Sequence, residues 1–163
     1  MTNKKTKLLI QNGVIAAMYL ALTIVVSPVA QGPIQFRISE SLNHLVVFNK
    51  KLMWGVFGGV VIYNLLFSEF GWLDIVFGGA QTLIALSLTA VLSRYVSDVK
   101  KRLALNIFFF TISMALIACM LHLAIDLPFW PTYGTTALSE FIIMTLSAPI
   151  MYGISQYVKF DQL

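Results

Sequence analysis

Long apolar runs dominate the chain and predict helices that cross a membrane. The five clearest runs cover residues 8–29, 52–67, 73–93, 103–125 and 136–158. One crossing of a bilayer as an α-helix takes roughly 20 predominantly apolar residues. We therefore interpret each run as one crossing, with short loops between them.

A sixth segment, residues 33–49, is apolar in its second half and polar in its first. Pro33 suits the first position of a helix, and the basic pair Lys50 and Lys51 separates the segment from the next run. We interpret it as a shorter, partly polar helix. The predicted fold is all-α, an integral membrane bundle of six transmembrane helices forming one domain over residues 1–163.

Composition supports this fold and excludes a soluble globular domain. The chain is 58% hydrophobic and only 11% charged, with a mean hydropathy of +0.83, whereas soluble domains carry about 25% charged residues. The single cysteine, Cys119, lies inside an apolar run, which excludes a disulfide framework or a C-x-x-C site. The first apolar run is too long for a cleaved signal peptide, so we expect a retained helix.

The basic residues predict the orientation of the bundle. Lys and Arg in short loops stay on the cytoplasmic side of a membrane, and six crossings with both termini cytoplasmic satisfy this rule for ten of the eleven. Arg37 alone falls on the outer half. Because the positive charge is spread over four boundaries, it does not form a nucleic-acid-binding patch. The ten are Lys4, Lys5, Lys7, Lys50, Lys51, Arg94, Lys100, Lys101, Arg102 and Lys159.

With this topology, five acidic residues fall on the outer half. Arg37, Glu40 and His44 follow one another at i, i+3 and i+7, which places them on one helix face. Two interpretations stay open, an internal Arg37–Glu40 pair or a polar stripe that faces a ligand cavity. Charges at membrane depth usually face a cavity, a partner or water. The five acids are Glu40, Glu69, Asp74, Asp126 and Glu140.

Further polar and aromatic residues gather at the same level. Asp74 and Gln81 share a face, as do His122 and Asp126. Gln81 and His122 fit interhelical hydrogen bonds, but the polar faces together favour one cavity open to the outside. Most outer aromatics fit an interface belt, and Trp130, in a loop between two prolines, is the candidate stacking lid over a planar ligand.

Small residues form a stripe on the first helix. Gly13, Ala17 and Ala21 recur every four residues, and such a stripe lets another helix approach closely. It fits either packing inside the bundle or a docking surface for another membrane protein.

Sequence motifs of catalysis do not occur in the chain. The G-x-x-x-x-G-K-[ST] phosphate loop, H-E-x-x-H, G-x-S-x-G and a Cys/His ligand cluster are all missing from the sequence. We therefore predict that the protein is not an enzyme and uses no cofactor or metal.

Two strings resemble a known family. G-P-I-Q-F-R-I-S-E at residues 32–40 and W-L-D-I-V-F-G at residues 72–78 are similar to the QueT family. These are membrane-embedded substrate-binding subunits, or S components, of energy-coupling factor (ECF) transporters for queuosine precursors. The pattern of six short helices extends the resemblance over essentially the whole chain.

The resemblance implies a multi-pass protein of the bacterial cytoplasmic membrane that captures a 7-deazaguanine precursor from outside. A separate coupling transmembrane subunit and two cytoplasmic ATPases would drive uptake, and the stripe of Gly13, Ala17 and Ala21 would meet the coupling subunit. The loop between the first two helices would close over the ligand.

Such a ligand is planar, has a donor edge, and in its aminomethyl form is cationic at one end. Carboxylates accept from that edge and pair with the ammonium. We expect Glu40 and Glu140 as the main contacts, with Arg37 positioning Glu40. The secondary candidates are Asp74, Gln81, Asn64, His122 and Trp130.

Three alternatives remain at this stage. The same architecture could bind a different vitamin, or the chain could be an autonomous small secondary transporter or channel, for which inverted repeats would be the signal. It could also be a structural or assembly protein with no saturable ligand.

Overall fold

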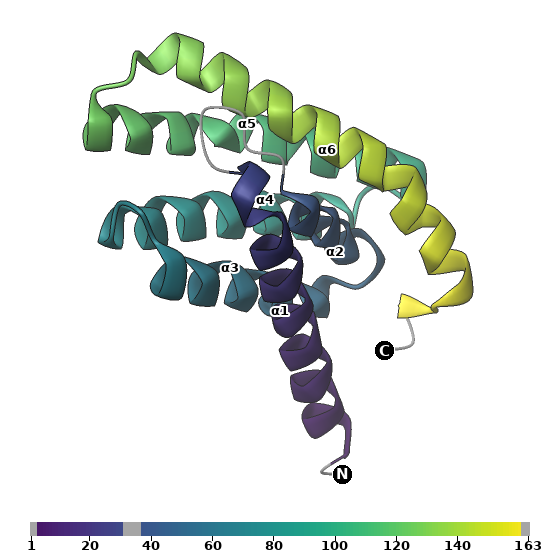
Figure 1. The fold of residues 1–163 in the computed structure, drawn as a ribbon. Coiled ribbons are helices and arrows are strands. Elements are labelled where there is room, and N and C mark those ends of the chain that lie inside the picture. Colours follow the sequence, from purple (N-terminus) through teal and green to yellow (C-terminus); the bar gives the residue numbers. More distant parts are fainter. Residues whose placement is uncertain (1–2, 31–36, 161–163) are drawn as a thin grey trace.

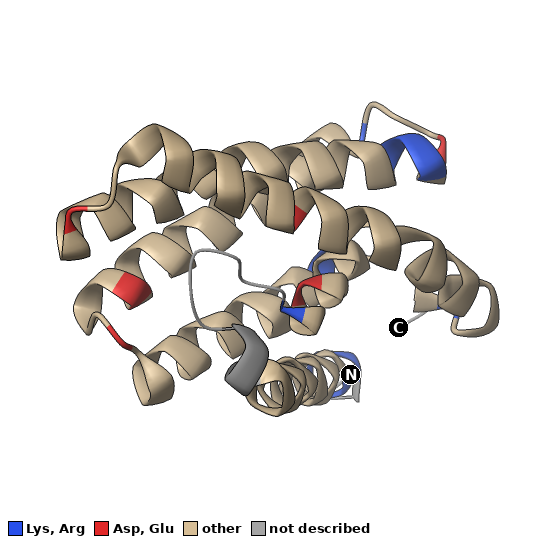
Figure 2. Cartoon of the chain, turned by 45° about the horizontal axis from the view of Figure 1, so that its top comes forward, with Lys and Arg blue, Asp and Glu red and all other residues tan. Residues whose placement is uncertain are grey.

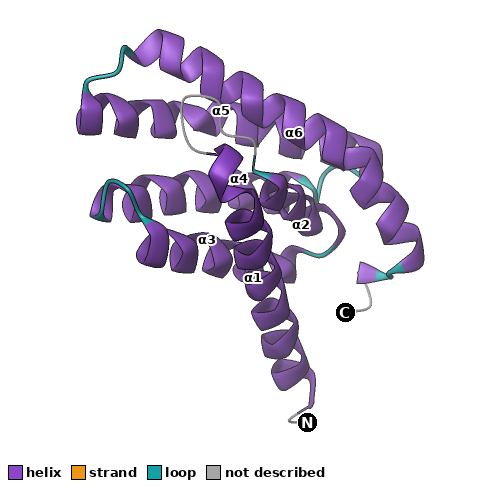
Figure 3. Cartoon of the chain, viewed as in Figure 1, coloured by secondary structure: helices purple, strands orange, loops and turns teal. Residues whose placement is uncertain are grey.

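A computed structural model describes the backbone of residues 3–30 and 37–160, and all of this described part is helix, turn or short loop (Figures 1 and 3). The prediction of an all-α fold is confirmed for these residues. In chain order the elements are α1 (Asn3–Ala30), the 3₁₀ helix η1 (Ile38–His44), α2 (Leu45–Phe48), the 3₁₀ turn η2 (Lys50–Leu52), α3 (Met53–Phe67), the π-helical turn η3 (Asp74–Gly78), α4 (Gly79–Leu92), α5 (Val99–Ile125) and α6 (Phe129–Tyr157).

Four of the helical segments are long and apolar enough to cross a membrane. They are Lys4–Val26, Asp74–Leu92, Val99–Ile125 and Phe129–Tyr157. The 15 residues of α3 rise about 22 Å, less than the roughly 30 Å of a hydrocarbon core. The prediction of six crossings therefore holds for four elements on length and composition, and α3 and η1–α2 are shorter.

The predicted helix over residues 33–49 differs from the structure in its winding. Residues 33–36 lie outside the described part, as does the loop predicted to close over the ligand. From Ile38 the chain winds as a 3₁₀ helix and becomes α-helical only over four residues of α2. The segment contains Ser39 and Asn43, residue types with a lower α-helix propensity than Ala or Leu, and their side chains bond to Thr23 and Glu40.

The last helix begins at Phe129, seven residues before the predicted start at residue 136. The expectation that Trp130 lies in a loop is thus wrong, because Trp130 belongs to the first turn of α6. Pro131 suggested a loop, but a proline is tolerated in the first turn, where its missing N–H has no helical partner to lose.

The helices form two groups, one of α4, α5 and α6 and one of α1 and α3. Figures 1 and 2 show them from two directions. α5 and α6 run antiparallel along most of their lengths, and α4 lies against α5 (Figure 1). α1 packs on α3 and crosses the other long helices steeply, so that Figure 2 looks almost down its axis. The buried core between the groups includes Tyr19, Leu52, Leu86, Phe110 and Met144.

Two glycines of α3 set the close approach of α1. A Cβ on Gly55 would lie 2.7 Å from the backbone oxygen of Asn12, and one on Gly59 would lie 2.7 Å from the Cβ of Tyr19. The two glycines form a G-x-x-x-G pair, the spacing that lets membrane helices meet at their backbones. The Gly55 N–H donates to Asn12 Oδ1 over 2.6 Å, which fixes the register of the two helices.

Charge is unequal at the two ends of the bundle. Acidic residues colour the end with the α3–α4 and α5–α6 turns, and basic residues gather at the α4–α5 turn on the opposite end (Figure 2). The start of α1 and the end of α6 also lie away from the acidic turns (Figure 1). This separation agrees with an even number of crossings, and the cytoplasmic placement of the termini stays a prediction.

Candidate functional site

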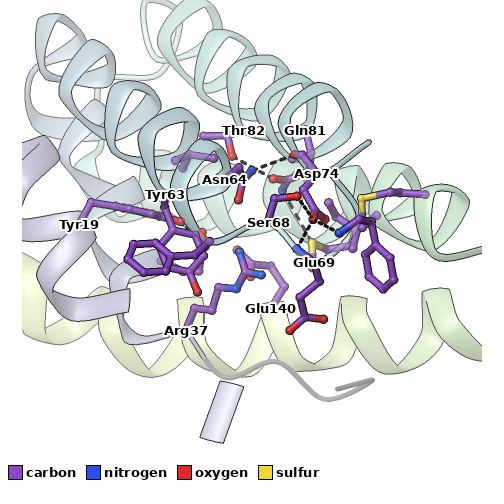
Figure 4. A pocket seen from close by; sticks show the side chains of 18 residues that line it. Tyr19, Arg37, Tyr63, Asn64, Ser68, Glu69, Asp74, Gln81, Thr82 and Glu140 are labelled. Atoms are coloured by element: carbon purple, nitrogen blue, oxygen red, sulfur yellow. Dashed lines mark hydrogen bonds between the residues drawn. The ribbon is translucent and has the colours of Figure 1, made fainter. Parts of the chain in front are cut away.

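A pocket opens between the two helix groups, towards the acidic end of the bundle. The pocket is open to solvent, and its space measures about 950 Å³ when the solvent at its mouth is included. Its apolar wall consists of Val60, Phe67, Phe70, Gly78, Met114, Ile117 and Met120. Its polar wall, most of which Figure 4 labels, consists of Tyr19, Arg37, Glu40, Tyr63, Asn64, Ser68, Glu69, Asp74, Gln81, Thr82 and Glu140.

Glu40 is held in this wall by two protein donors. The Tyr19 hydroxyl donates to Oε1 over 2.8 Å, and Asn43 Nδ2 donates to Oε2. Asn43 follows Glu40 by three residues, and a 3₁₀ helix has three residues per turn, so the two side chains lie on the same face. The carboxylate is therefore fixed from α1 and from its own helix, with 9% of the residue exposed.

Arg37 enters the pocket just before η1 begins. Its guanidinium lies over the ring of Tyr63, 5.8 Å from the ring centre, an arrangement that favours a cation on an aromatic face. Figure 4 shows Arg37 and Tyr63 on the same side of the pocket as Glu140. Arg37 is thus the cationic group that faces the carboxylates of the pocket.

His44, predicted to share the face of Arg37 and Glu40, lies behind the pocket. In this 3₁₀ helix residues 40 and 43 align, and the residue after 43 is turned by about 120°. His44 is fully buried, with Nε2 donating to the carbonyl of Met144 over 2.9 Å and Nδ1 facing Asn106 Nδ2 at 3.1 Å. It ties η1 to α5 and α6 and does not touch the pocket.

Glu140 reaches the pocket from the middle of α6. The residue is 4% exposed, and its Oε1 is buried without a hydrogen-bond partner. This differs from Glu40, both of whose oxygens accept from the protein. Of these two carboxylates, Glu40 is therefore fixed by the protein and Glu140 has free acceptor capacity.

Asp74 and Asn64 line the pocket and also build its rim. Asp74 Oδ2 accepts from the Ser68 hydroxyl over 2.8 Å and from the backbone N–H groups of Glu69 and Phe70. Asn64 Nδ2 donates to the Asp74 carbonyl over 2.8 Å. This bond supplies a partner for a carbonyl of the widened π-helical turn. π-turns of this kind often occur at functional sites.

Gln81 lies in the opposite wall, where α4 meets α5. Its Nε2 donates to Ser113 Oγ over 2.9 Å, and its Oε1 accepts from Thr82 over 3.1 Å. The side chain thus forms the interhelical bond that the sequence suggested and lines the pocket as well.

The structure does not bring His122 and Trp130 together with these residues. His122 is exposed near the end of α5, where its Nδ1 donates to the carbonyl of Leu127 over 2.8 Å. Trp130 is 76% exposed and packs edge-on against Phe129. Neither lines the pocket.

Sequence reasoning missed Tyr19 and Tyr63. Both lie in apolar helices, where a tyrosine is usually interpreted as a residue of the core or of the membrane interface. The spacing of Ile15, Tyr19 and Thr23, four residues apart and opposite the G-x-x-x-G pair of α3, is the signal that marks the inner face of α1.

The stripe of small residues lies on the outer side of the same helix. Gly13, Ala17 and Ala21 are exposed, whereas Tyr19 and Thr23 are buried against the bundle. A Cβ on Gly13 would meet nothing within 4 Å. Packing inside the bundle therefore does not account for the stripe.

Comparison with known proteins gives one family. The family model described as QueT transporter matches residues 9–156. The chain is also 39% identical, over 171 aligned positions, to a protein of Lactococcus lactis subsp. cremoris (strain MG1363) named queuosine precursor transporter QueT. The alignment covers 99% of this chain and all of that protein. No solved structure matches the chain.

Proposed function

The chain belongs to the QueT transporter family, and from this premise we propose that it binds a 7-deazaguanine precursor of queuosine for uptake. The observation that carries the proposal is the pocket, which combines one guanidinium, carboxylates from α6 and η1, and aromatic and apolar walls. A small planar molecule with polar edges needs a cavity that combines apolar walls with fixed polar groups. Four helices that are long and apolar enough to cross a membrane support a multi-pass membrane protein.

Roles follow from the geometry of the pocket. Glu140 and Glu40 are the carboxylates that meet the donor groups of the ligand, with Glu40 fixed by Tyr19 and Asn43. Arg37 balances part of their charge from its position over Tyr63. The rim formed by Asp74 and Asn64 and the wall around Gln81 supply the remaining polar contacts.

The chain acts as the substrate-binding subunit of an ECF transporter in the bacterial cytoplasmic membrane, with both termini in the cytoplasm. No phosphate-loop motif occurs in its sequence, so ATP hydrolysis comes from two cytoplasmic partner subunits. The exposed stripe of Gly13, Ala17 and Ala21 is the surface that meets the coupling transmembrane subunit, because small residues let two helices approach closely.

Uptake measurements test this function. Cells that express the chain together with an ECF coupling subunit and its ATPases should accumulate labelled aminomethyl-7-deazaguanine, and excess unlabelled ligand should abolish the signal. Guanine and thiamine serve as competitors. Absence of accumulation of the labelled ligand would contradict the proposed substrate, and full uptake without the coupling components would contradict the need for partners.

A further inference from the structure

The carboxylates of the pocket differ in the hydrogen bonds that they already accept from the protein. Among the described residues that line the pocket, the acidic ones are Glu40, Glu69, Asp74 and Glu140, and Arg37 carries the single guanidinium. Glu40 accepts from two side chains and Asp74 from three groups of its own turn. Glu69 is exposed to solvent. Glu140 alone combines deep burial with an oxygen that no protein donor reaches.

A buried carboxylate oxygen without a donor is costly, and the cost grows when a ligand displaces the remaining water. A neutral ring N–H would supply a hydrogen bond to Glu140 but no charge. An ammonium supplies both, and the attraction between its charge and that of the carboxylate adds to the hydrogen bond. The surplus of carboxylates over the single guanidinium favours the same choice.

We propose that the carboxylate of Glu140 receives a primary ammonium of the ligand, so that the pocket selects a cationic 7-substituted deazaguanine over neutral forms of the same ring. This inference rests on the proposed function and assigns the ligand group that Glu140 recognises. Both oxygens of Glu40 already accept from Tyr19 and Asn43. Glu40 therefore meets the ring of the ligand and contributes less to the preference for a cationic ligand.

The experiment compares three ligands by calorimetry on the full chain in detergent. Aminomethyl-7-deazaguanine carries the ammonium, hydroxymethyl-7-deazaguanine has nearly the same shape without charge, and 7-deazaguanine lacks the substituent. The wild-type protein should prefer the aminomethyl over the hydroxymethyl compound by about 10- to 100-fold, as expected for a hydrogen bond to a charged group. Glu140→Gln should reduce this preference to about threefold or less.

Asp126→Asn is the matched control, since it removes an exposed carboxylate that does not line the pocket and should leave the preference intact. Binding of 7-deazaguanine to each variant reports that it is folded, and the wild-type series decides the question if Glu140→Gln does not fold. Equal binding of the charged and neutral compounds, or an unchanged preference in Glu140→Gln, would overturn the inference alone. A folded wild-type chain that binds none of the three would overturn the proposed function.

Discussion

Replacing Gly59 by alanine tests whether the close contact of α1 and α3 positions the pocket. The new Cβ would lie 2.7 Å from the Cβ of Tyr19 and 3.2 Å from the carbonyl of Ala16, so α1 must shift. Overpacking of this kind costs about 1–3 kcal/mol. Because Tyr19 donates to Glu40, the shift should also weaken ligand binding.

Gly58→Ala is the matched control, because a Cβ there meets nothing within 4 Å and both glycines lie inside α3. Both variants gain the same helix propensity, about 1 kcal/mol, which cancels in their comparison. Gly59→Ala should therefore unfold about 2–12 °C below Gly58→Ala, as measured by tryptophan fluorescence in detergent. Equal melting temperatures and equal ligand affinity for the two variants would refute the reasoning.

Three further changes follow from the described contacts. His44→Ala removes the donor to the Met144 carbonyl and leaves Asn106 without its ring partner, which should cost about 1–3 kcal/mol of unfolding free energy; denaturant titration measures the loss, and His44→Gln should recover part of it. Ala17→Leu, on the exposed stripe, should leave calorimetric ligand binding intact and reduce uptake in cells that carry the coupling components; normal uptake would argue against docking there. Trp130→Ala should not change the dissociation constant, because the side chain lies outside the pocket, and a clear loss of affinity would restore its role as a lid.

The long apolar runs were sufficient to predict most of the helices, because crossing a bilayer requires a local signal about 20 residues long. The two failures have different causes, one tertiary and one local. The winding of η1 depends on bonds to another helix, such as that from Thr23 to Ser39. The start of α6 depends on a proline that is tolerated only because it falls in the first turn.

The candidate site was predictable in its charges and less so in its geometry. The charge asymmetry across the membrane indicated Glu40, Asp74 and Glu140 as candidate ligand contacts. All three line one pocket in the structure. Helical periodicity does not determine how a helix end is rotated, so His122 was grouped with residues it does not meet. Tyr19 was missed because its role depends on the hydroxyl reaching a carboxylate 21 residues away in sequence.

The central claim is that Glu140 receives the ammonium of the ligand. Its most direct test is a crystal structure of the full chain in complex with aminomethyl-7-deazaguanine. The account predicts ligand density in the pocket between η1, α3, α4 and α6, with the ammonium nitrogen about 2.7–3.0 Å from a carboxylate oxygen of Glu140. Density on another surface, or a ligand in the pocket whose ammonium points away from Glu140 to the solvent, would contradict it.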